Sequence, residues 1–129
     1  MGFLKSVIGP GKGVDAREAD RLVRAGGLLL DVREPDEWRA GHAPGARHVP
    51  LGNLKHSLGS MPRDRRIVVT CRSGGRSARA TALLTHTGYQ AVNLTGGMRA
   101  WASAGLPVET DGARPGKISG PEIAARVHG

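Results

Sequence analysis

The amino-acid sequence predicts an α/β protein: a small open parallel sheet with helices on both faces. Strand and helix patterns alternate along most of the 129 residues. The predicted strands are short and nearly continuous apolar runs, which is typical of strands that are buried on both faces. The length fits a single domain that can form its own hydrophobic core.

In the first half of the chain, capping residues and glycines mark the helix ends. Asp15 precedes a predicted helix over residues 16–25 and has Glu18 three residues later, which is the pattern of a capping box. A glycine pair ends this helix, and the apolar run at residues 28–32 is typical of a buried strand. The further elements predicted here are a short helix over 35–40, a strand over 46–49 and a helix over 51–58.

In the second half, residues 66–70 form the clearest predicted strand, because they are mostly β-branched and are bounded by charge. This strand leads directly into Cys71. Ser77 is predicted to open the next helix, over residues 78–87. The remaining predicted elements are a strand over 91–94 and a helix over 98–104.

The domain boundaries follow from composition. Residues 1–11 are predicted to be an N-terminal lead-in, and residues 12–109 the folded domain. Residues 110–117 have the composition of a linker. They begin a C-terminal tail, residues 110–129, which could hold one short helix over 121–127.

Positive charge is concentrated around the single cysteine. The chain carries a formal charge of +8, and residues 63–79 contain six arginines and one aspartate, a net +5. A focused positive field favours anionic ligands and lowers the pKa of a thiol. The stretch lacks interleaved aromatic residues and any nucleic-acid motif, so we expect a small anion as the partner and no specific nucleic acid.

Membrane and metal partners are not expected. No apolar run is long enough to span a bilayer, and the first residues lack the hydrophobic stretch of a secretory signal. A cytoplasmic location is therefore expected. The histidines show no metal-ligand spacing and one cysteine cannot form a Cys-rich site, so neither a metal nor a cofactor is expected.

Cys71 lies where a parallel sheet places its site, at the carboxyl end of a strand. Gly74 and Gly75 allow a tight turn in which successive N–H groups can form an anion nest. The following helix directs its positive end into the same space, and Arg72 and Arg76 add full charges. Such surroundings lower a thiol pKa from about 8.5 to about 3.5–7.5, so we expect Cys71 to be largely ionised at neutral pH.

Two chemistries use a thiolate held in this way: attack on phosphorus, as in Cys-x5-Arg phosphatases, and attack on a sulfane sulfur. Four residues separate Cys71 from Arg76, one fewer than in those phosphatases. The shorter loop suits a terminal sulfur on Cys71 better than a tetrahedral phosphate. Phosphatase or arsenate reductase chemistry is therefore disfavoured. An inert cysteine buried at a strand end is the remaining alternative.

Three segments resemble the motifs of single-domain rhodaneses: the loop Cys71–Ser77, Asp31–Trp38 with Gly41–Ala46, and Leu94–Trp101. They occur in the family's order, and the resemblance covers about residues 12–108. It implies a rhodanese-type sulfurtransferase that takes sulfur from thiosulfate or a persulfide donor. The cysteine would carry this sulfur as a persulfide until a second nucleophile removes it, which predicts ping-pong kinetics.

The resemblance also implies roles for the rest of the loop. Arg72 and Arg76 would attract an anionic donor and stabilise the developing charge. The residues carried over as donors to the sulfur or as loop-forming residues are Ser73, Gly74, Gly75 and Ser77.

Side chains outside the loop are expected to be structural. Asp31 and Arg33 follow a strand end near the loop, and we expect an ion pair that braces the loop rather than direct participation in catalysis. His42 is expected to stabilise a turn. Trp38 and Trp101 are expected in the core.

No second cysteine can resolve a persulfide, so the acceptor is expected to be external: cyanide, a small thiol or a protein. Two alternatives stay open. One is a sulfur carrier that serves a single partner protein. The other is a non-catalytic rhodanese-like binding module, although modules of that kind commonly lack the cysteine that this chain retains.

Overall fold

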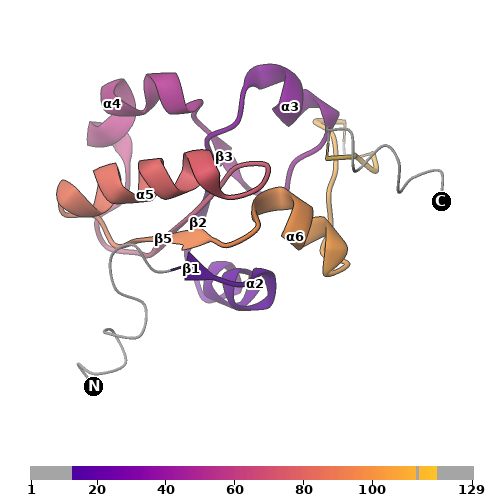
Figure 1. Cartoon of the computed structure of the whole chain (residues 1–129), viewed down its shortest axis with the longest axis horizontal. Helices are drawn as coiled ribbons and strands as arrows, with labels where there is room; N and C mark the ends of the chain where they lie inside the picture. Colours follow the sequence, from indigo (N-terminus) through magenta and orange to yellow (C-terminus); the bar gives the residue numbers. More distant parts are fainter. Residues whose placement is uncertain (1–12, 113, 119–129) are drawn as a thin grey trace.

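The computed structural model describes residues 13–112 and 114–118, which form one parallel sheet flanked by helices (Figure 1). The strands lie in the order β1-β5-β4-β2-β3, and each neighbouring pair is parallel. This confirms the predicted fold class. The strands are Gly13–Val14 (β1), Leu28–Asp31 (β2), Arg47–His48 (β3), Ile67–Thr70 (β4) and Ala91–Leu94 (β5).

The central strand β4 shows why the apolar runs are continuous. All four of its residues are buried, and it pairs with β2 on one side and β5 on the other. Ile67 and Val69 face one hydrophobic cluster and Val68 faces a second, because alternate side chains point to opposite faces of a sheet. Asp31 and Thr70 are register partners at the strand ends, which sets the position of Cys71 immediately beyond.

Helices cover both faces of the sheet (Figure 1). One face packs against α4 (Leu54–Ser57) and α5 (Gly75–His86), whose buried side chains include Leu54 and Leu84. The other packs against α2 (Ala16–Arg24) and α6 (Gly97–Ser103), with Ala19 and Trp101 in the second cluster. The sheet is thus the middle of three layers, as the buried strands require.

Several helices differ from their predicted bounds. The Asp15 cap is confirmed, since its carboxylate accepts a hydrogen bond of 2.8 Å from the Glu18 amide, and α2 ends at Arg24. The helix predicted over 51–58 is interrupted, because glycine and asparagine are poor helix formers. It consists of two 3₁₀ turns, η1 (Leu51–Asn53) and η2 (Leu58–Ser60), on either side of α4.

Helix α5 begins at Gly75, three residues before the predicted start at Ala78. Gly74 has φ +109°, a left-handed conformation that favours glycine, and it ends the loop early enough for the helix to start at once. Ser77 therefore lies in the first turn rather than opening the helix. The short helix α3 (Pro35–Ala40) matches its prediction, and strand β1, only two residues long, was not predicted.

Residues 109–112 and 114–118 contact the domain, in contrast to the linker predicted over 110–117. Glu109 forms isolated bridges with both His42 and Pro115, and the Lys117 amide donates to the Ala40 carbonyl at 2.8 Å. Ile118 is 2% exposed and belongs to the second hydrophobic cluster. The described part of this segment therefore packs onto the domain beside α3. The helix predicted over 121–127 lies outside the described residues.

Candidate active site at Cys71

Cys71 follows β4 directly, and its side chain is 1% exposed. Three donors from the following turn converge on its sulfur. The Gly74 amide lies 3.1 Å from Sγ, the Ser77 amide 3.4 Å and the Ser77 hydroxyl oxygen 3.3 Å. The anion nest expected from the sequence is thus formed by the loop and the first turn of α5.

These hydrogen bonds control the ionisation of the thiol. Burial alone raises the pKa of Cys71, but hydrogen bonds from the Ser77 hydroxyl and from the backbone of Ser77, Gly74 and Ser73 outweigh it. The pKa of Cys71 is therefore lower than its ordinary value. Dipoles aimed at a buried sulfur stabilise the negative charge because there is little water to screen them.

The loop backbone is held by α6. The Met98 amide donates to the Cys71 carbonyl at 2.7 Å, and the Arg99 amide donates to the Arg72 carbonyl at 3.0 Å. Gly97 makes this approach possible: a Cβ there would lie 2.5 Å from the Cys71 oxygen, and its φ of +60° also favours glycine. The first turn of α6 therefore determines the shape of the reactive loop.

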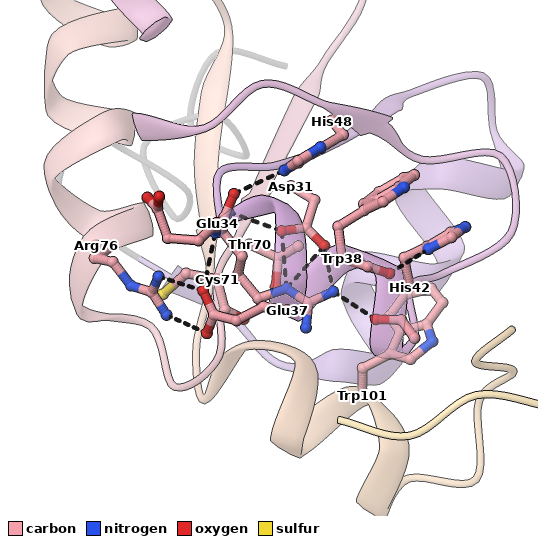
Figure 2. A network of polar contacts seen from close by, with 12 residues as sticks. Asp31, Glu34, Glu37, Trp38, His42, His48, Thr70, Cys71, Arg76 and Trp101 are labelled. Carbon is pink, nitrogen blue, oxygen red and sulfur yellow. Dashed lines mark hydrogen bonds and ion pairs between the residues drawn. The ribbon is translucent and has the colours of Figure 1, made fainter. Parts of the chain in front are cut away.

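Arg76 is bound by Glu37 of α3 (Figure 2). Its two terminal nitrogens lie 2.7 and 2.9 Å from the two Glu37 oxygens, a bidentate ion pair. The hydrogen bond from Arg76 lowers the pKa of Glu37, and the same contact raises the pKa of Arg76. The sequence predicted a full positive charge for substrate here, whereas the structure shows a charge already paired with a carboxylate.

Asp31 and Arg33 form the predicted ion pair. Both side chains are fully buried, and Arg33 Nη2 lies 2.8 Å from Asp31 Oδ2. The same Nη2 donates to the Gly41 carbonyl at 2.7 Å, so the pair braces the segment after α3. Its connection to the reactive loop is through the strand ends, where the Val32 amide donates to the Thr70 carbonyl.

The other predicted loop residues take up different positions. Ser73 and Gly75 are exposed on the outside of the loop, whereas Arg72 is half-buried and its carbonyl faces α6. Gly74 is buried with its amide toward the sulfur. Within the described part of the chain, no three His, Cys, Asp or Glu side chains are grouped in a way that could hold a metal ion.

Three aromatic rings are stacked at α3 and the segment that follows it. Trp38 lies between His42 and His48, with ring-centroid distances of 3.6 and 4.7 Å. The ring nitrogens of the histidines contact backbone carbonyls, His42 that of Trp38 and His48 that of Arg33 (Figure 2). His42 is thus part of the turn, as predicted. Trp101 is 3% exposed and lies in the core, and Trp38 is only half-buried.

Sequence reasoning missed several residues that shape the site. Glu37 lies within the segment Asp31–Trp38, but nothing in the sequence showed that it pairs with Arg76, 39 positions away. Asn93 donates to the Gly74 carbonyl at 3.3 Å, and the Thr70 hydroxyl donates to the Cys71 carbonyl at 3.2 Å. The available signal was a polar residue in an otherwise apolar strand: Thr70 is the last residue of β4, and Asn93 is the third of the four residues of β5.

Known proteins are similar to this chain in sequence and in fold. The family model for the rhodanese-like domain matches residues 15–104. A sulfurtransferase of Allochromatium vinosum is 43% identical over 82 residues, covering 63% of this chain and 77% of that protein. Thiosulfate sulfurtransferase 16, chloroplastic, of Arabidopsis thaliana is 38% identical over 109 residues, covering 74% of this chain and 91% of that protein.

Solved structures agree. A rhodanese-related protein of Thermoplasma volcanium has a TM-score of 0.71 and 31% identity, covering 75% of this chain and 96% of that chain. In the residues that the structure describes, no helix is long and apolar enough to cross a membrane. The family match spans most of the chain and includes the loop around Cys71, the strand before it and the helix that holds it. The chain therefore belongs to the rhodanese-like family.

Proposed function

We propose that this chain is a sulfurtransferase that carries a sulfane sulfur on Cys71 as a persulfide. The named relatives support sulfurtransferase activity in general. The observation that carries the proposal for this residue is the convergence of the Gly74 and Ser77 donors on one buried sulfur. A thiolate, rather than a thiol, is the nucleophile in such chemistry.

In the first step, the Cys71 thiolate attacks the outer sulfur of thiosulfate or of another persulfide. A bond forms between Sγ and that sulfur, and the sulfur–sulfur bond of the donor breaks. With thiosulfate, the electron pair leaves with sulfite. The negative charge passes from Sγ to the outer sulfur, so donors at Gly74 and Ser77 that are already aimed at the site stabilise it without reorganisation.

In the second step, an acceptor nucleophile attacks the outer sulfur. With cyanide, a carbon–sulfur bond forms, the persulfide bond breaks, and its electron pair returns to Cys71 as the thiolate while thiocyanate leaves. A small thiol or a protein would take the sulfur in the same way. Because Cys71 is the single cysteine, no internal thiol competes for the sulfur.

Two further residues of the loop, Ser73 and Arg76, have narrower roles in this proposal. The backbone of Ser73 helps to lower the pKa of Cys71. Arg76 contributes mainly through its pairing with Glu37, which fixes the first turn of α5 relative to α3.

A cytoplasmic location also stays a prediction, since the name of the Arabidopsis relative places that protein in the chloroplast.

The test is the intact mass of the protein before and after thiosulfate, and again after cyanide. We expect a gain of one sulfur atom, reversed by cyanide, and no gain in Cys71→Ser, which keeps a similar volume without the thiolate. Loading by a small persulfide but not by thiosulfate would indicate a dedicated carrier. Failure to load from any sulfane donor would contradict the proposal in favour of a binding module, and turnover of an aryl phosphate would indicate a phosphatase.

A further inference from the structure

Gly74 joins the reactive loop to α5, and both of its backbone polar groups have partners. Its amide lies 3.1 Å from Cys71 Sγ. Its carbonyl accepts one hydrogen bond from the Ala78 amide at 3.0 Å and a second from Asn93 Nδ2 at 3.3 Å. A carbonyl oxygen has two lone pairs, so both are occupied here. The direction of the Gly74 amide therefore depends on the two groups that hold its carbonyl.

A glycine needs such contacts to keep one conformation. Without a Cβ, glycine adopts left-handed and right-handed backbone conformations about equally readily, and Gly74 has φ +109°. The Ala78 amide belongs to the first turn of α5. The Asn93 side chain comes from a different element, the strand β5. Together the two donors fix the peptide unit that follows Gly74 and, through its backbone torsions, the direction of the amide that precedes it.

Asn93 occupies a position that favours an apolar side chain. It is the register partner of Val69 in β4. Its neighbours on that face of the sheet, Val69 and Ala91, belong to the hydrophobic cluster that packs against α5. The other amide atom of Asn93, Oδ1, is buried and has no hydrogen-bond partner among the described residues. A buried acceptor without a partner lowers stability, so the stability of the fold does not explain an amide at this position.

We propose that Asn93 is a positioning residue for the sulfur chemistry at Cys71: it holds the Gly74 carbonyl so that the Gly74 amide points at the sulfur. The inference rests on the proposed function, because it assigns Asn93 to the same sulfur site. Asn93 acts through Gly74 rather than by donating to the sulfur itself. Because the Gly74 amide stabilises the thiolate before transfer and the persulfide after it, Asn93 influences both the ionisation of the thiol and its uptake of sulfur.

A positioning role and a purely structural role predict opposite results for Asn93→Leu. Leucine has the same number of side-chain heavy atoms as asparagine, and it removes the unpartnered Oδ1 together with the donor. The Gly74 carbonyl keeps its hydrogen bond from the Ala78 amide. The variant should therefore unfold at a urea concentration equal to or above that of the wild type, while the Cys71 thiol becomes less acidic. A structural role would lower the urea midpoint and leave the acidity of the thiol unchanged.

The experiment combines alkylation of Cys71 by iodoacetamide over a range of pH with NMR of the backbone amides of the full chain. In Asn93→Leu the acid dissociation constant of the thiol should fall about threefold to tenfold. Losing a whole hydrogen bond to a charged group corresponds to about tenfold, and here the Gly74 amide is displaced rather than removed. The change in the Gly74 amide proton shift as Cys71 ionises should shrink, and that of the Ser77 amide should remain. Sulfur uptake from thiosulfate below the thiol pKa should slow, because less of the thiol is ionised there.

Gln90→Leu is the matched control. Gln90 lies just before β5, at the end away from the loop, and its side-chain amide also donates to a backbone carbonyl, that of Arg63 at 3.0 Å. Removing this amide should leave the alkylation profile and the Gly74 proton shift as they are in the wild type. Asn93→Ala removes the same donor as Asn93→Leu without adding volume, and the acidity of the thiol should fall in the same way. This second variant keeps the test decisive if Asn93→Leu folds poorly.

Each contrary outcome has a distinct meaning. An alkylation profile that is unchanged in both Asn93 variants overturns the positioning role. An equal change in Gln90→Leu overturns it in favour of a general effect on the sheet. Equal losses of the Gly74 and Ser77 proton shifts overturn it because the whole loop has then moved. Failure of the wild-type chain to load sulfur from any sulfane donor overturns the proposed function, whereas the alkylation profiles still decide whether Asn93 directs the Gly74 amide at Cys71.

Discussion

Removing the Ser77 hydroxyl tests whether hydrogen bonds, rather than the surrounding arginines, lower the pKa of Cys71. The hydroxyl oxygen lies 3.3 Å from Sγ, and both side chains are buried, so water cannot readily replace the lost donor in Ser77→Ala. The Ser77 amide, 3.4 Å from Sγ, remains. The variant thus removes one of the donors that offset the cost of burying a thiolate.

The size of the effect follows from the energy of such a contact. A hydrogen bond to a charged group contributes about 1.5–3 kcal/mol, and about 1.4 kcal/mol corresponds to a factor of ten in an equilibrium constant. Because sulfur is a weak acceptor, we take the lower end of this range. The acid dissociation constant of the Cys71 thiol should fall about tenfold, so the pKa rises.

The assay is the pH dependence of alkylation by iodoacetamide, which reacts with the thiolate. Cys71 is the single cysteine, so every alkylated molecule reports on this site. Ser73→Ala is the matched control, because Ser73 is exposed and acts on the pKa of Cys71 through its backbone. An unchanged profile in Ser77→Ala, or an equal shift in Ser73→Ala, would refute the assignment of the hydroxyl.

Three further variants test the contacts around the site. Glu37→Gln should lower the free energy of unfolding at pH 7 by about 1–2 kcal/mol, since it breaks the bidentate pair with Arg76. The pair lowers the pKa of Glu37, so the difference in the free energy of unfolding between the wild type and the variant should be fully present above about pH 4.3. It should shrink as the pH falls through the folded-state pKa, and urea titrations at several pH values would measure it. Gly97→Ala should lower the free energy of unfolding by about 2–3 kcal/mol and slow alkylation of the thiol. The control Gly52→Ala has nothing within 4 Å of the added Cβ and should lower it by less than about 1 kcal/mol. Equal losses in the two variants would contradict the close approach of α6 to the loop. Ile118→Ala should lower the free energy of unfolding by about 2–4 kcal/mol in the same titrations, because its side chain is buried in the core. A loss below about 0.5 kcal/mol would show that residues 114–118 do not pack on the domain in solution.

Elements with strong local signals could be predicted from the sequence, and those defined by tertiary contacts could not. Strand β4 and helix α2 carry their own signals, a β-branched run and the Asp15 cap. Strand β1 has two residues and exists because it pairs with β5. The packing of Ile118 is similar: its burial depends on a turn that brings residues 114–118 back beside α3.

The same distinction applies to the site. The position of Cys71 at a strand end and the donors of the following turn are local properties of one short loop, and they could be predicted. The contribution of Gly97 could not, because α6 approaches the loop from 26 positions further along the chain. Glu37 likewise meets Arg76 only after α3 and α5 pack side by side.

The pairing of Arg76 changes how the reactivity of Cys71 is explained. From the sequence, the concentration of arginines near Cys71 suggested that full charges stabilise the thiolate. In the structure, the charge of Arg76 is paired with Glu37, and the groups that donate to the sulfur are two amides and a hydroxyl. Full charges attract any anion and are screened by salt. The N–H and O–H dipoles of a buried turn instead act at short range, on the atom to which they donate. The loop can therefore stabilise in turn a thiolate on Sγ and the charge of a bound persulfide. In the proposed function, the other arginines of residues 63–79 contribute a positive field that attracts anionic reactants.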